Sequence, residues 1–147
     1  MKLKEPHASI LAECDPRLRI LDFSLVDEGT YGATFIRPNG VRLILSIETH
    51  QVGFSVALFT QCQSPTGGWI PQILMDVMAP EYSKLCLAAL DDGIPGVEGT
   101  RAWWNSFLDF LQQQGRILLT GIPDAELISA YEERLQIKLR QLGIQSQ

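Results

Sequence analysis

The sequence predicts an α+β fold, in which a four-stranded antiparallel β-meander is followed by three to four helices packed on its apolar face. Two observations favour this class. Residues 18–60 alternate between apolar and polar positions and are rich in β-branched and aromatic residues, whereas residues 71–142 place apolar residues at helical spacing. A chain of 147 residues without a repeat or a linker is expected to form a single domain over residues 1–147.

The first predicted element is a short helix over residues 7–12. Pro6 suits the point at which a helix begins, because the N–H that proline lacks would have no helical partner there. The Asp15-Pro16 pair is expected to end this helix, since a residue before proline disfavours helical backbone. The strands are therefore predicted to begin soon afterwards, at about Leu18.

Four strands are predicted between Leu18 and Thr60, and the turn at Asn39-Gly40 sets their register. An Asn-Gly pair favours a two-residue hairpin, which places Ile36 opposite Leu43. Extended to the outer strands, the register places Leu25 beside Gly32 and Leu45 opposite Leu58. In this register one face is apolar on all four strands, and we take it as the core face. The opposite face carries a cross-strand row of two aromatic residues and an isoleucine, namely Phe35, Ile44 and Phe59. Such a row is expected to be covered by another part of the chain or used for association.

Two short helices are predicted after a polar connection over residues 61–70. Pro71 and Pro80 each suit a first helical position, so the helices are expected over residues 72–78 and 81–90. A glycine-containing loop is expected to follow the second of them.

Two longer helices complete the prediction. Thr100 can cap a helix that runs to Gln114, and its broad apolar stripe indicates a central position between the sheet and another helix. Asp124 can cap a last helix that continues to Leu142. The stripe of the first of these helices contains Trp103, Phe107 and Phe110.

The charge distribution favours a basic partner. The net charge is −5, and residues 43–100 contain six acidic residues with Lys84 as their only basic residue. An acidic chain without basic runs is a poor match for nucleic-acid phosphates, so no nucleic-acid partner is expected. Asp91 and Asp92 end a predicted helix where acids oppose the helix dipole, and they are candidate partner-binding residues. Phe35, Ile44 and Phe59 are the other candidates for partner binding.

These features support three hypotheses of function. The first is a non-enzymatic protein-binding domain, such as an acidic inhibitor or immunity-type protein for a basic partner. The second is a small-molecule-binding protein or enzyme, because the predicted register brings four polar side chains to one face, namely Tyr31, Glu48, His50 and Ser55. The third is a homodimer built through the row of Phe35, Ile44 and Phe59. No residue is assigned a catalytic role.

The cysteine and histidine content favours a cytoplasmic protein without a metal site or cofactor. The cysteines Cys14, Cys62 and Cys86 include no CxxC pair, and the two histidines add too few ligands for zinc spacing. Buried, reduced thiols are therefore expected. The longest apolar run, residues 85–90, is too short to cross a bilayer, and the N-terminal region lacks the apolar segment of a signal peptide.

Overall fold

The computed structural model describes residues 3–48, 53–60, 68–90 and 96–143, and its fold is α+β, as predicted. The four strands form one antiparallel sheet in the order β1(Ser24–Gly29), β2(Gly32–Ile36), β3(Arg42–Ile47) and β4(Phe54–Phe59). The helices are α1(His7–Ile20), α2(Pro71–Met78), α3(Pro80–Ala89), α4(Val97–Gln112), α5(Arg116–Thr120) and α6(Ala125–Gln141).

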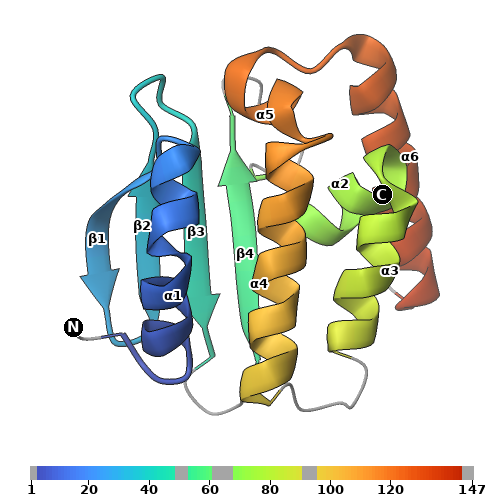
Figure 1. Ribbon diagram of the computed structural model, residues 1–147. Helices are drawn as coiled ribbons and strands as arrows, with labels where there is room; N and C mark the ends of the chain where they lie inside the picture. Colours follow the sequence, from blue (N-terminus) through green and yellow to red (C-terminus); the bar gives the residue numbers. More distant parts are fainter. Residues whose placement is uncertain (1–2, 49–52, 61–67, 91–95, 144–147) are drawn as a thin grey trace.

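The helices form a layer against one face of the sheet and continue beyond its β4 edge. Helices α1 and α4 lie side by side across the sheet, whereas α2, α3 and α6 lie beyond β4 (Figure 1). Between the layers, Leu43 and Leu58 from the sheet and Phe107 from α4 are fully buried. The ring of Trp103 packs edge-on against Phe54, with 5.3 Å between ring centres. Helix α4 therefore has the central position that its broad apolar stripe predicts.

Helix α1 is longer than predicted and contains Pro16. The prediction that Asp15-Pro16 ends the helix is wrong, and residues 18–20 are helical rather than part of a strand. Because Pro16 has no N–H, the carbonyl of Ala12 loses its helical hydrogen bond. Ala12 is exposed, so water can donate to this carbonyl instead. The burial of apolar side chains along α1 stabilises the helix by more than the lost hydrogen bond destabilises it. The side chains that α1 buries against α4 and the sheet include Ile10, Leu11, Cys14 and Leu18.

Helix α1 ends in a tight reversal at Asp22, whose φ is 66°. The Asp22 N–H donates to the Arg19 carbonyl at 2.9 Å, and the Phe23 N–H donates to the Leu18 carbonyl at 2.9 Å. These two bonds satisfy carbonyls that the helix end leaves without partners. Glycine usually occupies the left-handed position of such a helix end, and here Asp22 occupies it. Strand β1 therefore begins only at Ser24, which is six residues later than predicted.

The turn between β2 and β3 shifts the predicted register by one residue. Phe35 faces Leu43, and Ile36 faces Arg42. The Gly40 N–H donates to the Arg37 carbonyl at 2.9 Å, and Gly40 has a φ of 92°. Pro38 thus occupies the second position of a type I turn, and glycine adopts the left-handed conformation after it, which lengthens the loop. The shift turns Phe35 toward the helices, opposite to the prediction.

The other two strand pairs also differ from the prediction. Leu45 faces Val56 rather than Leu58, a shift of two residues that leaves the predicted faces of β3 and β4 unchanged. Strand β1 contains a bulge between Leu25 and Asp27. Apart from Glu28, which is half-buried, all of its residues are exposed, as expected of a strand at the edge of the sheet.

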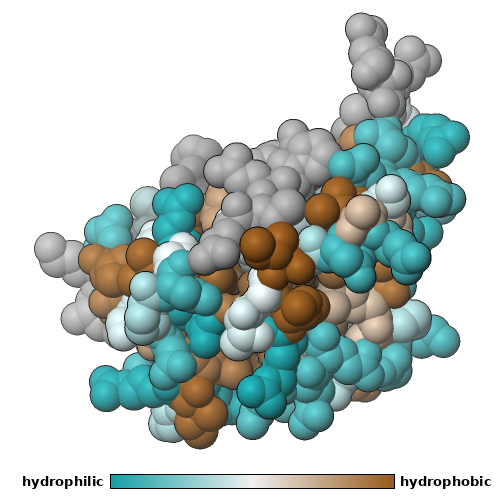
Figure 2. All heavy atoms as spheres, turned by 90° about the horizontal axis from the view of Figure 1, so that it is seen from above, coloured by the Kyte–Doolittle hydropathy of each residue, from teal (hydrophilic) through white to brown (hydrophobic). Residues whose placement is uncertain are grey.

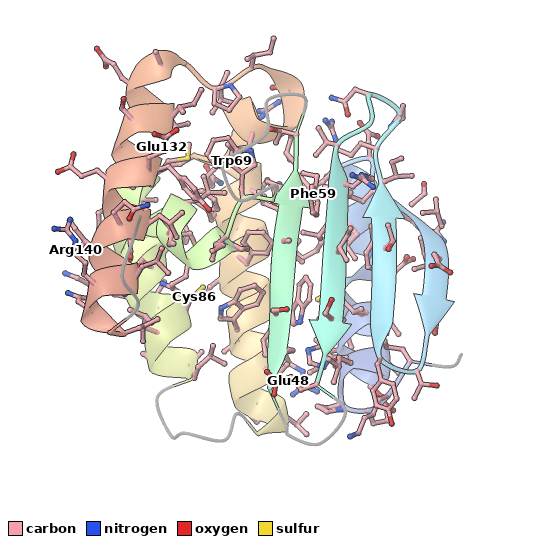
Figure 3. The ribbon with its side chains drawn as sticks, turned by 180° about the vertical axis from the view of Figure 1, so that it is seen from behind. Glu48, Phe59, Trp69, Cys86, Glu132 and Arg140 are labelled. Atoms are coloured by element: carbon pink, nitrogen blue, oxygen red, sulfur yellow. The ribbon has the colours of Figure 1, made fainter. Side chains whose placement is uncertain are left out.

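The edge of β4 is partly covered by the segment that leads into α2. Leu58 and Trp69 exchange two backbone hydrogen bonds of 3.0 and 2.7 Å, and the Trp69 ring packs against Tyr131 of α6. Figure 3 shows Trp69 between β4 and α6. A side chain at Gly68 would approach the Phe59 ring to 2.9 Å, so any larger residue here would need the ring to shift. The two edges of the sheet are therefore unequal, because β1 lies at the end away from these helices.

The predicted helices in the second half are confirmed, with small changes at their ends. Helices α2 and α3 begin at their prolines, and the Asp124 carboxylate accepts the Leu127 N–H at 2.8 Å at the start of α6. Helix α4 begins three residues before Thr100, which is buried instead of capping the helix. The one-turn helix α5 is absent from the prediction, because five residues are too few to show a helical period.

Candidate binding site

The predicted row of Phe35, Ile44 and Phe59 does not exist in the sheet. Phe35 is only 6% exposed and lies on the side of the helices. Ile44 and Phe59 lie on the outer face, but Ile44 faces Ala57, and Phe59 faces Arg42. The guanidinium of Arg42 lies over the Phe59 ring, 4.9 Å from its centre. The geometric basis of the homodimer hypothesis is therefore lost.

The polar group predicted around Glu48 is also divided between the two faces. The Ile47 N–H donates to the Tyr31 carbonyl at 2.8 Å, so Tyr31 continues the alternation of Phe35 on the side of α1. Lys4, just before α1, lies over the Tyr31 ring, 5.9 Å from its centre. Glu48 and Ser55 are exposed on the outer face, which Figure 3 shows in front of the helices. The structure does not bring Tyr31 together with Glu48.

Three predicted site residues lie outside the described residues. They are His50 of the polar group and the acidic pair Asp91 and Asp92. Cys62 lies outside them as well.

A pocket of about 260 Å³ lies between α1 and the β1 edge of the sheet. Its walls are mostly apolar, with Leu11 and Ala12 from α1, Leu25 from β1, and Ala33 and Phe35 from β2. Two carboxylate residues, Asp15 and Glu28, also line it. Leu25 is 46% exposed and the adjacent Val26 is 57% exposed, so apolar surface continues from the pocket onto the edge strand.

The segment before α1 forms the remaining wall of this pocket. Leu3 lines the pocket and is 5% exposed. Its N–H donates to the Glu28 carboxylate at 3.1 Å, and the Lys4 N–H donates to the Thr30 carbonyl at 2.8 Å. Leu3 and Lys4 thus lie beside the C-terminal end of β1. These two hydrogen bonds hold the Leu3 side chain against the apolar wall of the pocket.

The sequence pattern did not predict this pocket. The pocket depends on the full length of α1 and on the bulge in the edge strand β1, and neither feature follows from the spacing of apolar residues. The prediction ended the first helix at residue 12, which removed Asp15 from the helix. It also placed Leu25 on a core-facing strand in register with Gly32, whereas the bulge and the edge position leave Leu25 half open to solvent. The detectable signal was the apolar pair Leu25-Val26, which breaks strict alternation directly before the acidic pair Asp27-Glu28.

A second pocket, of about 300 Å³, lies where α1, the β2–β3 turn and α5 meet. Its main polar group, the Arg37 side chain, binds neighbouring parts of the fold. The Arg37 guanidinium donates to the carbonyls of Leu21 and Leu119 and lies 3.6 Å from the Asp22 carboxylate. Figure 2 views this end of the molecule, where the surface is largely hydrophilic with small, separate hydrophobic groups. We interpret this pocket as a polar junction between elements.

The buried titratable groups lie in the core. His7 is 3% exposed, its ring packs edge-on against Phe54 at 4.6 Å between centres, and burial lowers the pKa of His7 from 6.5 to about 4. Burial raises the pKa of the Cys86 thiol to about 12 and also raises the pKa of Cys14. Both thiols are thus protonated and weakly nucleophilic. The prediction of buried, reduced thiols is confirmed for these two cysteines.

A polar cluster joins the helices beyond β4. The Asp76 carboxylate of α2 lies 3.1 Å from Arg134 and 3.9 Å from Lys138, both in α6. It also accepts a hydrogen bond from the Ser83 hydroxyl of α3. The side chain of Asp76 is 11% exposed, so these partners offset the cost of burying its charge. The cluster fixes the packing of three helices and lies far from the pocket between α1 and β1.

The described residues contain no group of three histidine, cysteine or acidic side chains placed to hold a metal ion. Among the described helices, none has both the length and the apolar character needed to cross a membrane. The chain matches no protein-family model, no curated protein and no solved structure.

Proposed function

We propose that this chain is a non-enzymatic protein-binding domain that receives a basic partner, in the manner of an acidic inhibitor or immunity-type protein. The contact surface that we assign, the α1–β1 surface, comprises the pocket between α1 and β1 together with Val26 and Asp27. The observation that carries the proposal is the apolar pocket, which opens beside a half-exposed leucine at the β1 edge.

The size and lining of the pocket favour a protein side chain over a small-molecule ligand. Its volume of about 260 Å³ lies below the range of about 300–1,000 Å³ that is usual for small-molecule sites. Its walls are apolar, and the apolar surface continues onto Leu25 and Val26. Such a pocket suits one large apolar residue, which is how anchor residues dock at protein interfaces.

The charge of this surface favours a basic partner. Asp27 is exposed and makes no ion pair among the described residues. Asp15 lies 2.8 Å from Arg19, but both side chains are at least half exposed, and such surface pairs contribute little stability. With a net charge of −5, the whole chain attracts cationic proteins.

The proposal also concerns the enzymatic alternative and the location of the protein in the cell. The enzymatic alternative is less favoured, because Tyr31 and Glu48 lie on opposite sides of the sheet. A cytoplasmic location fits the reduced, buried thiols of Cys14 and Cys86.

The proposal is tested by filling the pocket from the surface of α1. Ala12 is exposed and lines the pocket, so Ala12→Phe occupies the pocket without disturbing the core. Ala102→Phe is the matched control, because Ala102 is an exposed alanine of α4. Proteins captured from the native cell by the unchanged chain are purified, and their affinities for both variants are measured.

We expect a basic partner whose affinity falls at least tenfold with Ala12→Phe and is unchanged with Ala102→Phe. Raising the salt concentration is expected to weaken the association, because it screens the attraction between the acidic surface and the partner. Equal binding by both variants, or loss of an acidic protein only, would contradict the proposal.

A further inference from the structure

The first described residues of the chain occupy part of the proposed contact surface. Leu3 is nearly fully buried against the pocket, and Lys4 forms a backbone hydrogen bond to the Thr30 carbonyl at the end of β1. The sequence here is Lys2-Leu3-Lys4, an apolar residue between two basic ones. The surface thus already holds one apolar and one basic residue of the chain itself, Leu3 and Lys4.

We propose that the partner's contact segment has the same chemistry, an apolar residue flanked by lysine or arginine, and that it displaces Leu3 and Lys4 from the α1–β1 surface. This inference rests on the proposed function, and it specifies both the partner's contact segment and an intramolecular competitor for it.

The contacts that hold this segment are of a kind that another chain can reproduce. Two are hydrogen bonds from backbone donors, one from the Leu3 N–H to the Glu28 side-chain carboxylate and one from the Lys4 N–H to the Thr30 backbone carbonyl. The third places the Lys4 ammonium over the ring of Tyr31, which is 44% exposed. A partner's backbone and a basic side chain can form all three.

The space beside Leu3 favours the partner in this competition. The pocket of about 260 Å³ is lined by Leu3 but not filled by it. An incompletely filled apolar pocket lacks the dispersion contacts that a larger side chain would make. A phenylalanine or tryptophan at the position of Leu3 is therefore expected to bury more apolar surface than leucine does. We infer that the partner's central residue is aromatic.

The charge of β1 disfavours a second copy of this chain as the occupant. The strand has the sequence Ser-Leu-Val-Asp-Glu-Gly and carries two acidic residues without a basic one. Two such strands side by side would bring Asp27 and Glu28 close to their copies, and opposed like charges destabilise strand pairing. A basic segment relieves this repulsion.

The inference is tested by supplying the segment as a separate peptide. In Leu3→Gly the leucine side chain is absent, and the vacated surface is offered the acetylated and amidated pentapeptide Met-Lys-Leu-Lys-Glu, which is the chain's own first five residues. We expect saturable binding with chemical-shift changes at Leu25 and Ala33, at least tenfold tighter than binding to the unchanged chain. A peptide with tryptophan in place of leucine is expected to bind several-fold tighter still.

Peptides with aspartate in place of leucine, or with glutamate in place of both lysines, are the matched controls and are expected not to bind. The inference is overturned if the leucine peptide binds both proteins equally, binds elsewhere, or fails to bind Leu3→Gly at millimolar concentration. Lys4→Ala, at an exposed position, provides a second release variant that leaves the apolar contacts of Leu3 in place.

A measurement with the captured partner separates this inference from the proposed function. If Ala12→Phe abolishes partner binding while Leu3→Gly and Lys4→Ala leave the affinity unchanged, the binding surface is correct and the competition is wrong. An affinity raised in both release variants supports the competition. If Ala12→Phe has no effect on any partner, the proposed function itself fails.

Discussion

At the scale of single residues, His7 shows how burial sets the charge state of a side chain. It lies at the start of α1 and packs against Phe54 of β4 and Trp104 of α4, so it joins three elements. Its Nε2 has no hydrogen-bond partner among the described residues, and neither has the Trp104 Nε1. A protonated imidazole at this position would lack compensation for its charge, which explains the lowered pKa.

This lowered pKa predicts that the protein loses stability in mild acid. Between pH 6.5 and about 4 the unfolded chain binds a proton at His7 that the folded chain excludes, so the free energy of unfolding falls as the pH falls through this range. The loss is at most about 3 kcal/mol, and it is complete below the folded pKa. Urea unfolding from pH 7.5 to 4 is expected to show this slope, and His7→Phe is expected to reduce it. An unchanged slope in His7→Phe would assign the acid sensitivity to other groups.

At the scale of elements, the period of the sequence predicts the type of each long element but not the phase between neighbours. Helix α6 and the strands β3 and β4 follow directly from spacing and capping. The register of β2 depends on whether Asn39-Gly40 forms a two-residue or a longer turn, and Pro38 decides this by favouring a type I turn. The extent of α1 depends on tertiary burial, which outweighs Pro16. The pocket depends on the register of β2 and on the extent of α1, and therefore the sequence pattern alone does not predict the pocket.

The register of β2 is tested by two neighbouring substitutions. Phe35 is buried on the side of the helices, so Phe35→Ala is expected to lower the free energy of unfolding by about 3–5 kcal/mol. Ile36 is half-buried on the outer face opposite Arg42, and Ile36→Ala is expected to cost clearly less. Denaturant unfolding of the two variants measures the difference. The reverse order would support the register in which Ile36 faces Leu43.

At the scale of the whole molecule, the polar cluster around Asp76 and the proposed binding surface lie at opposite ends of the sheet. Beyond β4, the edge is joined to α6 through Trp69 and Tyr131, and the Asp76 cluster joins three helices. At the other end, α1 and β1 enclose an incompletely filled pocket, and β1 is mostly exposed. The side chains beyond β4 thus support the fold, and the end at α1 and β1, opposite to α6 in Figure 1, is the one that we propose for recognition.

This arrangement predicts which acidic residues steer the partner. Electrostatic attraction falls off over about 8 Å at physiological salt, so charges near the contact surface dominate the association rate. Asp27 lies within the α1–β1 surface, whereas helix α3, the last described element before Asp91 and Asp92 in the sequence, lies beyond the β4 edge of the sheet (Figure 1). With the partner from the Ala12→Phe screen, we expect Asp27→Asn to slow association in stopped-flow measurements and to reduce its salt dependence. The double variant Asp91→Asn and Asp92→Asn carries a larger charge change and is expected to have the smaller effect. If the double variant is the slower one, the acidic middle of the sequence, rather than the α1–β1 surface, receives the partner.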